Sequence, residues 1–123
     1  MKCKLLVAED ELIERKVLCK TLQKYLGDLI SLYEAKNGRE AMELFAREAP
    51  QVAVLDIEMP GMNGIYIGNS LKKRNENIII FVVTSYSEYL DEAMRFHVFR
   101  YLSKPLEKQR LFRNLKDALT SVS

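Results

Sequence analysis

Short apolar runs alternate along the whole chain with stretches in which apolar residues follow the spacing of a helix. Each run is four to six residues long, and three are rich in β-branched residues, which is typical of strands buried on both faces. Short strands separated by helices form a parallel sheet with helices on both sides. The strands that this pattern predicts are Lys4–Ala8, Leu29–Tyr33, Val52–Leu55, Ile78–Val83 and Val98–Leu102.

The stretches between and after these runs predict five helices. In the first, Glu11–Leu26, apolar residues recur every three or four positions, and Gly27 is expected to cap its carboxyl end. Right-handed crossovers through such helices fold five parallel strands into a doubly wound α/β sandwich of three layers. The apolar residues of the first helix are Ile13, Val17, Leu18, Leu22, Tyr25 and Leu26. The other predicted helices are Arg39–Glu48, Ile65–Arg74, Ser87–Phe96 and Leu106–Val122.

The composition fits one globular domain over residues 1–123, because 48% of the residues are hydrophobic and 29% are charged. No apolar run approaches the roughly 18 residues needed to cross a bilayer, so we expect no membrane partner. Cys3 and Cys19 match no zinc spacing and predict reduced thiols in a cytoplasmic protein. The net charge is only +2 and the basic stretches resemble solvated helix faces, so we expect no direct nucleic-acid contact by this domain.

Polar side chains follow four of the predicted strands. Because the carboxyl ends of parallel strands meet at one edge of a sheet, and ligands bind there in doubly wound folds, these residues are expected to converge. Each has an ordinary structural explanation when it is taken alone, such as a helix cap, a turn residue or a surface charge. Four such groups at one edge are much harder to explain in that way. The residues are Glu9-Asp10-Glu11, Asp56, Thr84-Ser85 and Lys104-Pro105.

Asp56 directly follows four apolar residues, Val52–Leu55, so its carboxylate is expected to be buried. Burial of an unpaired carboxylate is unfavourable, and several carboxylates at close range need a cation to remain ionised. Oxygen ligands alone favour Mg²⁺, which proteins often bind together with phosphate oxygens. A metal, a lysine (Lys104) and a carboxylate that can attack phosphorus indicate phosphoryl transfer to Asp56.

The residues of this edge resemble those of a known family in order and spacing. The matching segments are Glu9-Asp10, Asp56 within LDIEMPGMNG, Thr84 within FVVTS, Tyr101 within RYLSKP, and Lys104-Pro105. Over essentially its whole length the chain resembles the receiver domain of response regulators in two-component signalling. The resemblance implies a flavodoxin-like fold with a five-stranded parallel sheet in the order 2-1-3-4-5.

By this resemblance, Asp56 accepts a phosphoryl group from a sensor histidine kinase. Mg²⁺ would be held directly by Asp10 and Asp56, by Glu9 through water, and by the backbone carbonyl of Glu58. The family most often has aspartate where this chain has Glu9. The extra methylene should be tolerated in a ligand that acts through water.

The resemblance also assigns the groups that respond to phosphorylation. Thr84 and Lys104 would contact the phosphoryl oxygens, Tyr101 would be an aromatic switch, and the bond before Pro105 would be cis. Phosphorylation would change the surface formed by the fourth helix, fifth strand and fifth helix. Through this surface the chain is expected to control an effector, which is either covalently attached or a separate protein and is expected to be transcriptional. A homodimer formed through the same surface is also expected. The only chemistry expected is phosphorylation and dephosphorylation of the chain itself.

Two features separate this chain from common receivers. Phe99-Arg100 stands where many receivers of winged-helix regulators carry acids, which argues against their salt-bridged dimer. The amino-terminal half resembles receivers of AraC-type regulators and the carboxyl-terminal half those of LytTR-type regulators. A hybrid joined near Gly64–Ile65 and ordinary divergence both explain this difference.

Two other classes of protein fit less well. A phosphatase of the haloacid-dehalogenase type also uses an aspartate after a strand, but it needs a second aspartate where this chain has Glu58. Its acidic metal pair also comes late in the chain, whereas Glu9-Asp10 comes first. A flavodoxin-like FMN carrier needs a loop rich in Ser, Thr and Gly after the first strand, where Glu9-Asp10-Glu11 would repel the FMN phosphate.

Some residues invite a functional interpretation for weaker reasons. Glu58 and Tyr86, each two positions beyond a site residue, should flank the approach of a hydrolytic water, and Tyr86 could shield the acyl phosphate. His97 is expected to be a surface or packing residue rather than a phosphohistidine. The methionines Met59, Met62 and Met94 are expected in the core or in loops.

Overall fold

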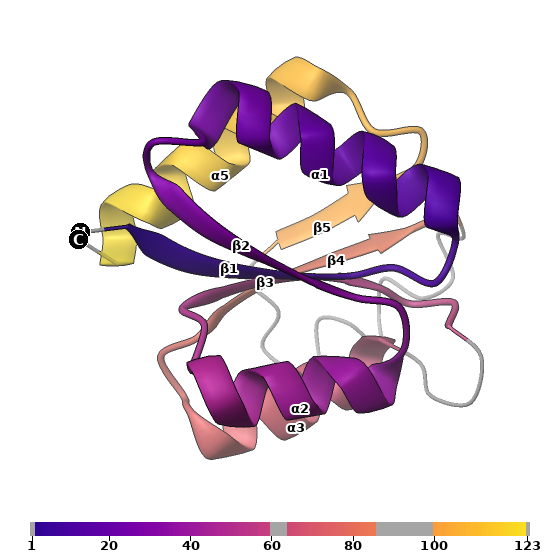
Figure 1. The fold of residues 1–123 in the computed structure, drawn as a ribbon, viewed down its shortest axis with the longest axis vertical. Helices are drawn as coiled ribbons and strands as arrows, with labels where there is room; N and C mark the ends of the chain where they lie inside the picture. The colour runs from indigo at the N-terminus through magenta and orange to yellow at the C-terminus, as the bar shows by residue number, and fades with distance from the viewer. Residues whose placement is uncertain (1, 60–63, 86–99, 123) are drawn as a thin grey trace.

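The computed structural model describes residues 2–59, 64–85 and 100–122. In these residues five strands form one parallel sheet in the order β2-β1-β3-β4-β5, as expected (Figure 1). The strands are β1 (Cys3–Ala8), β2 (Ile30–Ala35), β3 (Val52–Asp56), β4 (Ile79–Thr84) and β5 (Arg100–Ser103). The helices described are α1 (Leu12–Leu26), α2 (Gly38–Glu48), α3 (Gly64–Arg74) and α5 (Lys108–Val122).

The helices cover both faces of the sheet, with α1 and α5 on one face and α2 and α3 on the other (Figure 1). In β1, Leu5 and Val7 pack with the cluster under α1 and α5, whereas Leu6 and Ala8 pack with the cluster under α2 and α3. Successive side chains of a strand point to opposite faces, so a strand between two helical layers must be apolar at every position. This explains why the sequence shows continuous apolar runs rather than alternation.

The apolar pattern of α1 is broader than the face that this helix buries. Cys19, Leu22 and Leu26 are buried, but Ile13 and Val17 are 71% and 59% exposed. Helical spacing shows which residues share a face, but it does not show how much of that face a neighbouring element covers. The amino-terminal half of α1 therefore carries an apolar surface that faces solvent.

The ends of the helices differ in how they are capped. The Asn37 side chain accepts a hydrogen bond from the Glu40 backbone at 2.8 Å, and the Glu40 side chain accepts one from the Lys36 backbone at 2.9 Å, so α2 starts with two satisfied donors. At its other end Ala49 has a left-handed backbone, with φ of 48°. Gly27 follows α1 with right-handed dihedral angles, so left-handed freedom is not the reason for glycine there.

Several predictions fall on residues that the structure does not describe. These are the helix Ser87–Phe96, the start of the strand Val98–Leu102, and the residues Met62, Tyr86, Met94, His97 and Phe99. Met59 is described and is buried in the core, as expected. Within residues 2–59, 64–85 and 100–122, no helix has the length and apolar character that a membrane span requires.

Candidate phosphoryl-transfer site

The polar residues predicted to meet at one edge of the sheet do so. Glu9 and Asp10 follow β1, Asp56 is the last residue of β3, Thr84 is the last residue of β4, and Lys104 follows β5. The parallel register aligns the strand ends, because Asp56 pairs with Val83 and Thr84 pairs with Ser103. The sheet therefore fixes the relative positions of side chains that are up to 95 residues apart in sequence.

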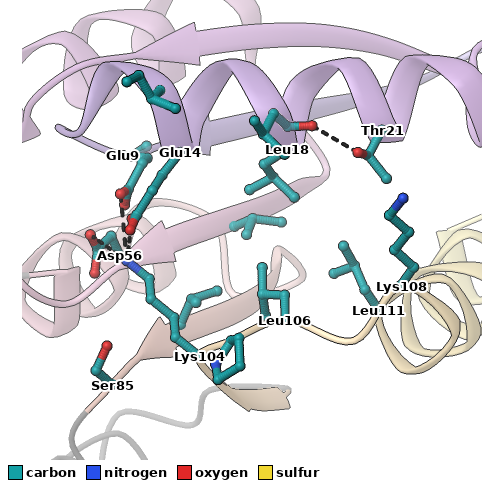
Figure 2. Close-up of a pocket in the computed structure, with 16 residues that line it drawn as sticks. Glu9, Glu14, Leu18, Thr21, Asp56, Ser85, Lys104, Leu106, Lys108 and Leu111 are labelled. Carbon is teal, nitrogen blue, oxygen red and sulfur yellow. Dashed lines mark hydrogen bonds and ion pairs between the residues drawn. The ribbon is translucent and has the colours of Figure 1, made fainter.

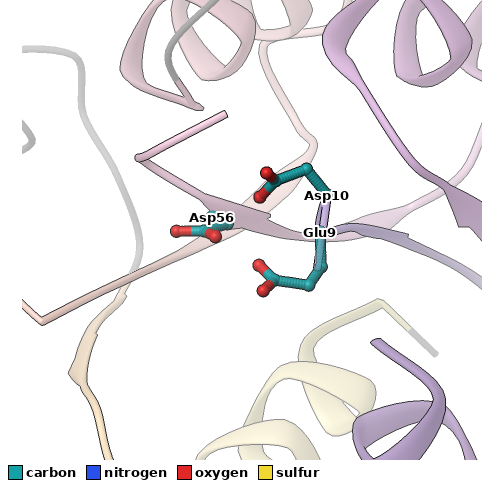
Figure 3. Close-up of side chains that lie close together, drawn as sticks. All are labelled: Glu9, Asp10 and Asp56. Atoms are coloured by element: carbon teal, nitrogen blue, oxygen red, sulfur yellow. The ribbon is translucent and has the colours of Figure 1, made fainter. Parts of the chain in front are cut away.

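Three carboxylates form the centre of this site. Glu9, Asp10 and Asp56 each place one carboxylate oxygen within 4.8 Å of those of the other two. Figure 3 shows the carboxylates of Glu9 and Asp10 on either side of that of Asp56. Glu9 and Asp56 are buried and Asp10 is exposed, so the cluster is anchored in the sheet but open to solvent on one side.

The oxygen cluster fits the divalent cation that the sequence predicts. All three side chains offer hard oxygen ligands, which favour Mg²⁺ over softer transition metals. Burial raises the pKa of the Glu9 carboxyl to about 10, and hydrogen bonds to Asp56 and Glu14 add to this effect. Without a cation, the charged form of Glu9 is therefore disfavoured, because a second negative charge this close to the buried Asp56 carboxylate is unfavourable.

Lys104 supplies the positive charge opposite the carboxylates. Its Nζ lies 3.4 Å from Asp56 Oδ2, 3.5 Å from Glu9 Oε1 and 2.8 Å from Glu14 Oε2 (Figure 2). Burial by itself lowers the pKa of the Lys104 ammonium, but the hydrogen bond to Glu14 and the charges of the three carboxylates raise it above its usual value. Lys104 therefore remains positively charged beside Asp56.

The backbone next to Lys104 fixes this lysine beside β4. The Lys104 N–H donates to the Thr84 carbonyl at 2.9 Å. The peptide bond between Lys104 and Pro105 is cis, which is the isomer that the resemblance implied.

Thr84 and Glu58 form a second connection across the site. Thr84 is fully buried, and its hydroxyl donates a hydrogen bond to Glu58 Oε1. The Glu58 N–H donates to Asp56 Oδ1 at 3.1 Å, and the Ile57 N–H donates to the Val83 carbonyl at 3.1 Å. The loop after β3 is thus tied both to the carboxylate of Asp56 and to the end of β4.

Tyr101 lies in β5 opposite Val82 of β4. It is half-buried and packs against the apolar cluster under α2 and α3. Thr84 pairs with Ser103, so Tyr101 and Thr84 lie on neighbouring strands two positions apart in the register.

Two residues near the site were not singled out from the sequence. Glu14 lies on the first turn of α1 and makes the shortest of the three contacts to Lys104. Gly64 begins α3, and a Cβ there would lie 2.2 Å from the carbonyl oxygen of Asp56. The glycines in MPGMNG could have indicated a close approach of the backbone at Gly64. The contact between Glu14 and Lys104 joins residues 90 positions apart, and no pattern in the sequence indicates it.

A cavity of about 480 Å³ opens between α1, α5 and the carboxyl ends of the strands. Its lining along α1 and α5 is mainly apolar, with Leu18 and Leu111 beside the polar Thr21 and Lys108, and it becomes charged towards Asp56 (Figure 2). The exposed apolar surface of α1 therefore adjoins the candidate site.

The comparisons with known proteins agree with this architecture. The family model of the response regulator receiver domain matches residues 5–116. The sensory transduction protein LytT of Oceanobacillus iheyensis is 36% identical over 112 residues, which cover 89% of this chain and 45% of that protein. The transcriptional regulatory protein BtsR of Salmonella typhi is 35% identical over 112 residues, which cover 91% of this chain and 46% of that protein.

A solved structure of a DNA-binding response regulator of the LuxR family from Staphylococcus aureus has a TM-score of 0.85 and 30% identity. The similarity covers 95% of this chain and 98% of that one. The chain spans less than half the length of the two curated relatives. The family match, the identities and the shared fold together show that the chain belongs to the response regulator receiver domains of two-component systems.

Proposed function

We propose that this chain is a phosphorylation-controlled signalling switch in which Asp56 accepts a phosphoryl group from a sensor histidine kinase. The observation that carries the proposal is the setting of Asp56. Its side chain is only 4% exposed, yet it lies at the open end of a strand between an acidic pair and the Lys104 ammonium. A carboxylate held in this way is positioned to attack phosphorus rather than to stabilise the fold.

The transfer forms a bond between an Asp56 oxygen and phosphorus and breaks the bond between phosphorus and an imidazole nitrogen of the kinase. Lys104 donates to one phosphoryl oxygen and Thr84 donates to another. Asp10 and Asp56 would hold Mg²⁺ directly, Glu9 through water and Glu58 through its backbone carbonyl. When bound, Mg²⁺ neutralises charge on the phosphoryl oxygens.

The exposed apolar surface of α1 supports a protein as the phosphoryl donor. Leu12, Ile13 and Val17 are each more than half exposed, and two of them line the cavity that reaches Asp56. A helical partner docked there could place its phosphohistidine over Asp56. The cytoplasm, where two-component kinases expose their phosphohistidine, is the proposed location.

The output proposed for the switch is a change in the surface that includes β5 and α5. Thr84 moves toward the phosphoryl oxygen, and Tyr101 turns into the space that this movement leaves. The altered surface controls an effector, proposed to be transcriptional by analogy with the transcriptional regulatory protein BtsR, or supports a homodimer. The chain itself performs only its own phosphorylation and dephosphorylation.

The acceptor is tested by incubating the chain with Mg²⁺ and a small acyl phosphate and measuring its intact mass. We expect the addition of one phosphoryl group to the wild type and none to Asp56→Asn. Asp28→Asn is the matched control, because Asp28 is exposed at the opposite edge of the sheet, between α1 and β2. Labelling of Asp56→Asn to the wild-type extent, or labelling that survives removal of all divalent ions, would contradict the proposal.

A further inference from the structure

Glu14 occupies a position that the proposed phosphoryl chemistry does not explain. An ammonium group has three N–H donors, and Lys104 has three carboxylate partners, Asp56, Glu9 and Glu14 (Figure 2). Asp56 and Glu9 belong to the acidic cluster at the strand ends. Glu14 comes from α1, yet its distance of 2.8 Å is the shortest of the three.

The start of α1 is held so that Glu14 faces Lys104. The neighbouring Arg15 donates through Nη1 to the backbone carbonyl of Glu9 at 2.9 Å and through Nε to Glu34 at 3.3 Å. These contacts attach the first turn of α1 to the ends of β1 and β2. A carboxylate in a first turn is also favoured by the helix dipole.

We propose that Glu14 holds the place of a phosphoryl oxygen on Lys104, so that phosphorylation of Asp56 must displace Glu14 from the ammonium. Glu14 is thus a positioning residue, which acts through Lys104. This proposal rests on the proposed function of Asp56 as the acceptor.

Burial indicates which of the three carboxylates gives way. The side chains of Asp56 and Glu9 are 4% and 7% exposed, whereas that of Glu14 is 54% exposed. A carboxylate released from the interior would lose its partner without gaining water, but Glu14 can be hydrated as soon as it leaves Lys104. A phosphoryl group carries almost two negative charges and is the stronger competitor for the ammonium.

The consequence is that Glu14 opposes phosphoryl binding in the resting chain. Glu14→Gln removes the competing charge and leaves only a weaker, neutral acceptor for one N–H donor of Lys104. We expect the affinity for beryllofluoride, measured by calorimetry in the presence of Mg²⁺, to rise by up to about fivefold, the upper limit set by an exposed ion pair. The rate of labelling by a small acyl phosphate should rise in parallel.

Removal of any negative charge near an anion site also favours anion binding, so the control must share that effect. Glu11→Gln makes the same charge change at the residue directly before α1, and Glu11 is exposed. The contact itself is observed through the ¹⁵N signal of the Lys104 ammonium, assigned by its loss in Lys104→Arg. We expect Glu14→Gln to move this signal in the chain without beryllofluoride and Glu11→Gln to leave it in place.

The outcomes separate this inference from the proposed function. If the wild type binds beryllofluoride but Glu14→Gln and Glu11→Gln have equal affinities, the role of Glu14 is wrong and Asp56 remains the acceptor. An increase in affinity with an unchanged Lys104 signal would also overturn the inference, because the cause would not be the contact. If the wild type neither binds beryllofluoride nor takes up phosphate, the proposed function fails.

Discussion

The hydroxyl of Thr84 donates a hydrogen bond to the carboxylate of Glu58, two residues beyond Asp56. Thr84 is fully buried, so this hydroxyl cannot exchange Glu58 for water without a local rearrangement. A hydroxyl has only one donor, and the proposed switch needs that donor for a phosphoryl oxygen. Glu58 therefore acts on Thr84 in the resting chain.

Glu58→Gln should make this hydrogen bond easier to break. The amide keeps the shape of the side chain but replaces a charged acceptor by a neutral one, which weakens the bond by about 1 kcal/mol. We expect the affinity for beryllofluoride to rise about fivefold, the factor that corresponds to this energy. Glu76→Gln is the control, because Glu76 is exposed in the turn before β4, at the opposite edge of the sheet. An unchanged affinity in Glu58→Gln would mean that Glu58 does not restrain Thr84.

Thr84→Ala should separate phosphorylation from its output. Asp56 and Lys104 do not depend on the Thr84 hydroxyl for their contact, so the variant should still take up phosphate. Tyr101 should respond weakly, because the Thr84 contact is the differential interaction proposed between the two states. The environment of the Tyr101 ring can be followed by NMR before and after addition of beryllofluoride. Equal changes in Thr84→Ala and wild type, at equal phosphorylation, would contradict the coupling.

The stability of the metal-free chain should fall as pH rises, because of Glu9. Burial raises its pKa from 4.5 to about 10, so the folded chain binds this proton more tightly than the unfolded chain. The contribution of the Glu9 proton to the free energy of unfolding is fully present below pH 4.5 and is lost progressively as pH rises towards 10. Glu9→Gln should flatten this part of the profile in urea unfolding without divalent ions. If the free energy of unfolding depends on pH equally in Glu9→Gln and in the wild type between about pH 6 and 9, Glu9 is not the group that binds the proton.

The sequence was most informative where the fold imposes a pattern on neighbouring residues. The strand predicted at Val52–Leu55 is found at Val52–Asp56. Its four apolar residues could be predicted because a strand covered on both faces is apolar along its buried length, and Asp56 adds one polar residue at its carboxyl end. The meeting of Asp56 with Glu9 and Lys104 could also be predicted, since strand ends meet at one edge of a parallel sheet. These predictions use only local pattern and topology.

The sequence was least informative where a contact depends on how an element is rotated or covered. The exposure of Ile13 and Val17 follows from what packs against α1, and spacing alone does not contain this information. The ion pair of Glu14 with Lys104 joins α1 to the loop after β5 across 90 residues, and neither residue type is unusual at its position. Both features bear on function rather than on the fold.

Gly64→Ala should disturb the loop that carries Asp56. The new Cβ would lie 2.2 Å from the carbonyl oxygen and 2.8 Å from the carbonyl carbon of Asp56, and these are backbone atoms that cannot rotate away. We expect a loss of about 1–3 kcal/mol in the free energy of unfolding, measured with urea, and slower labelling of Asp56.

Gly68→Ala is the matched control for this substitution. Gly68 lies in the same helix, and its Cβ would meet only side-chain atoms of Ile80 and Leu55 at 3.6 Å, which is ordinary contact. This variant should be as stable as the wild type or up to about 1 kcal/mol more stable, since alanine favours a helix interior over glycine. Equal losses in both variants would show that the close approach of Gly64 to Asp56 is not the cause.

The exposed apolar surface of α1 should affect the rate of phosphoryl transfer from a protein donor but not from a small acyl phosphate. Ile13 is 71% exposed, so Ile13→Ser should change the free energy of unfolding by no more than about 0.5 kcal/mol. If a kinase docks on α1, transfer from the phosphorylated kinase that labels the wild type should slow by about tenfold, the effect of losing one apolar anchor of about 1.4 kcal/mol. Labelling by a small acyl phosphate should be unchanged, because Ile13 lies outside the reacting groups.

Tyr66→Ser provides the control for this docking surface. Tyr66 is 68% exposed, almost as much as Ile13, but it lies on α3, across the sheet from α1. We expect both kinase transfer and acyl phosphate labelling of this variant to match the wild type. Equal slowing of kinase transfer in Tyr66→Ser and Ile13→Ser would place the docking surface elsewhere. Slower labelling by the small donor in Ile13→Ser would mean that the substitution had altered the site itself, because a docking residue acts only when the donor is a protein.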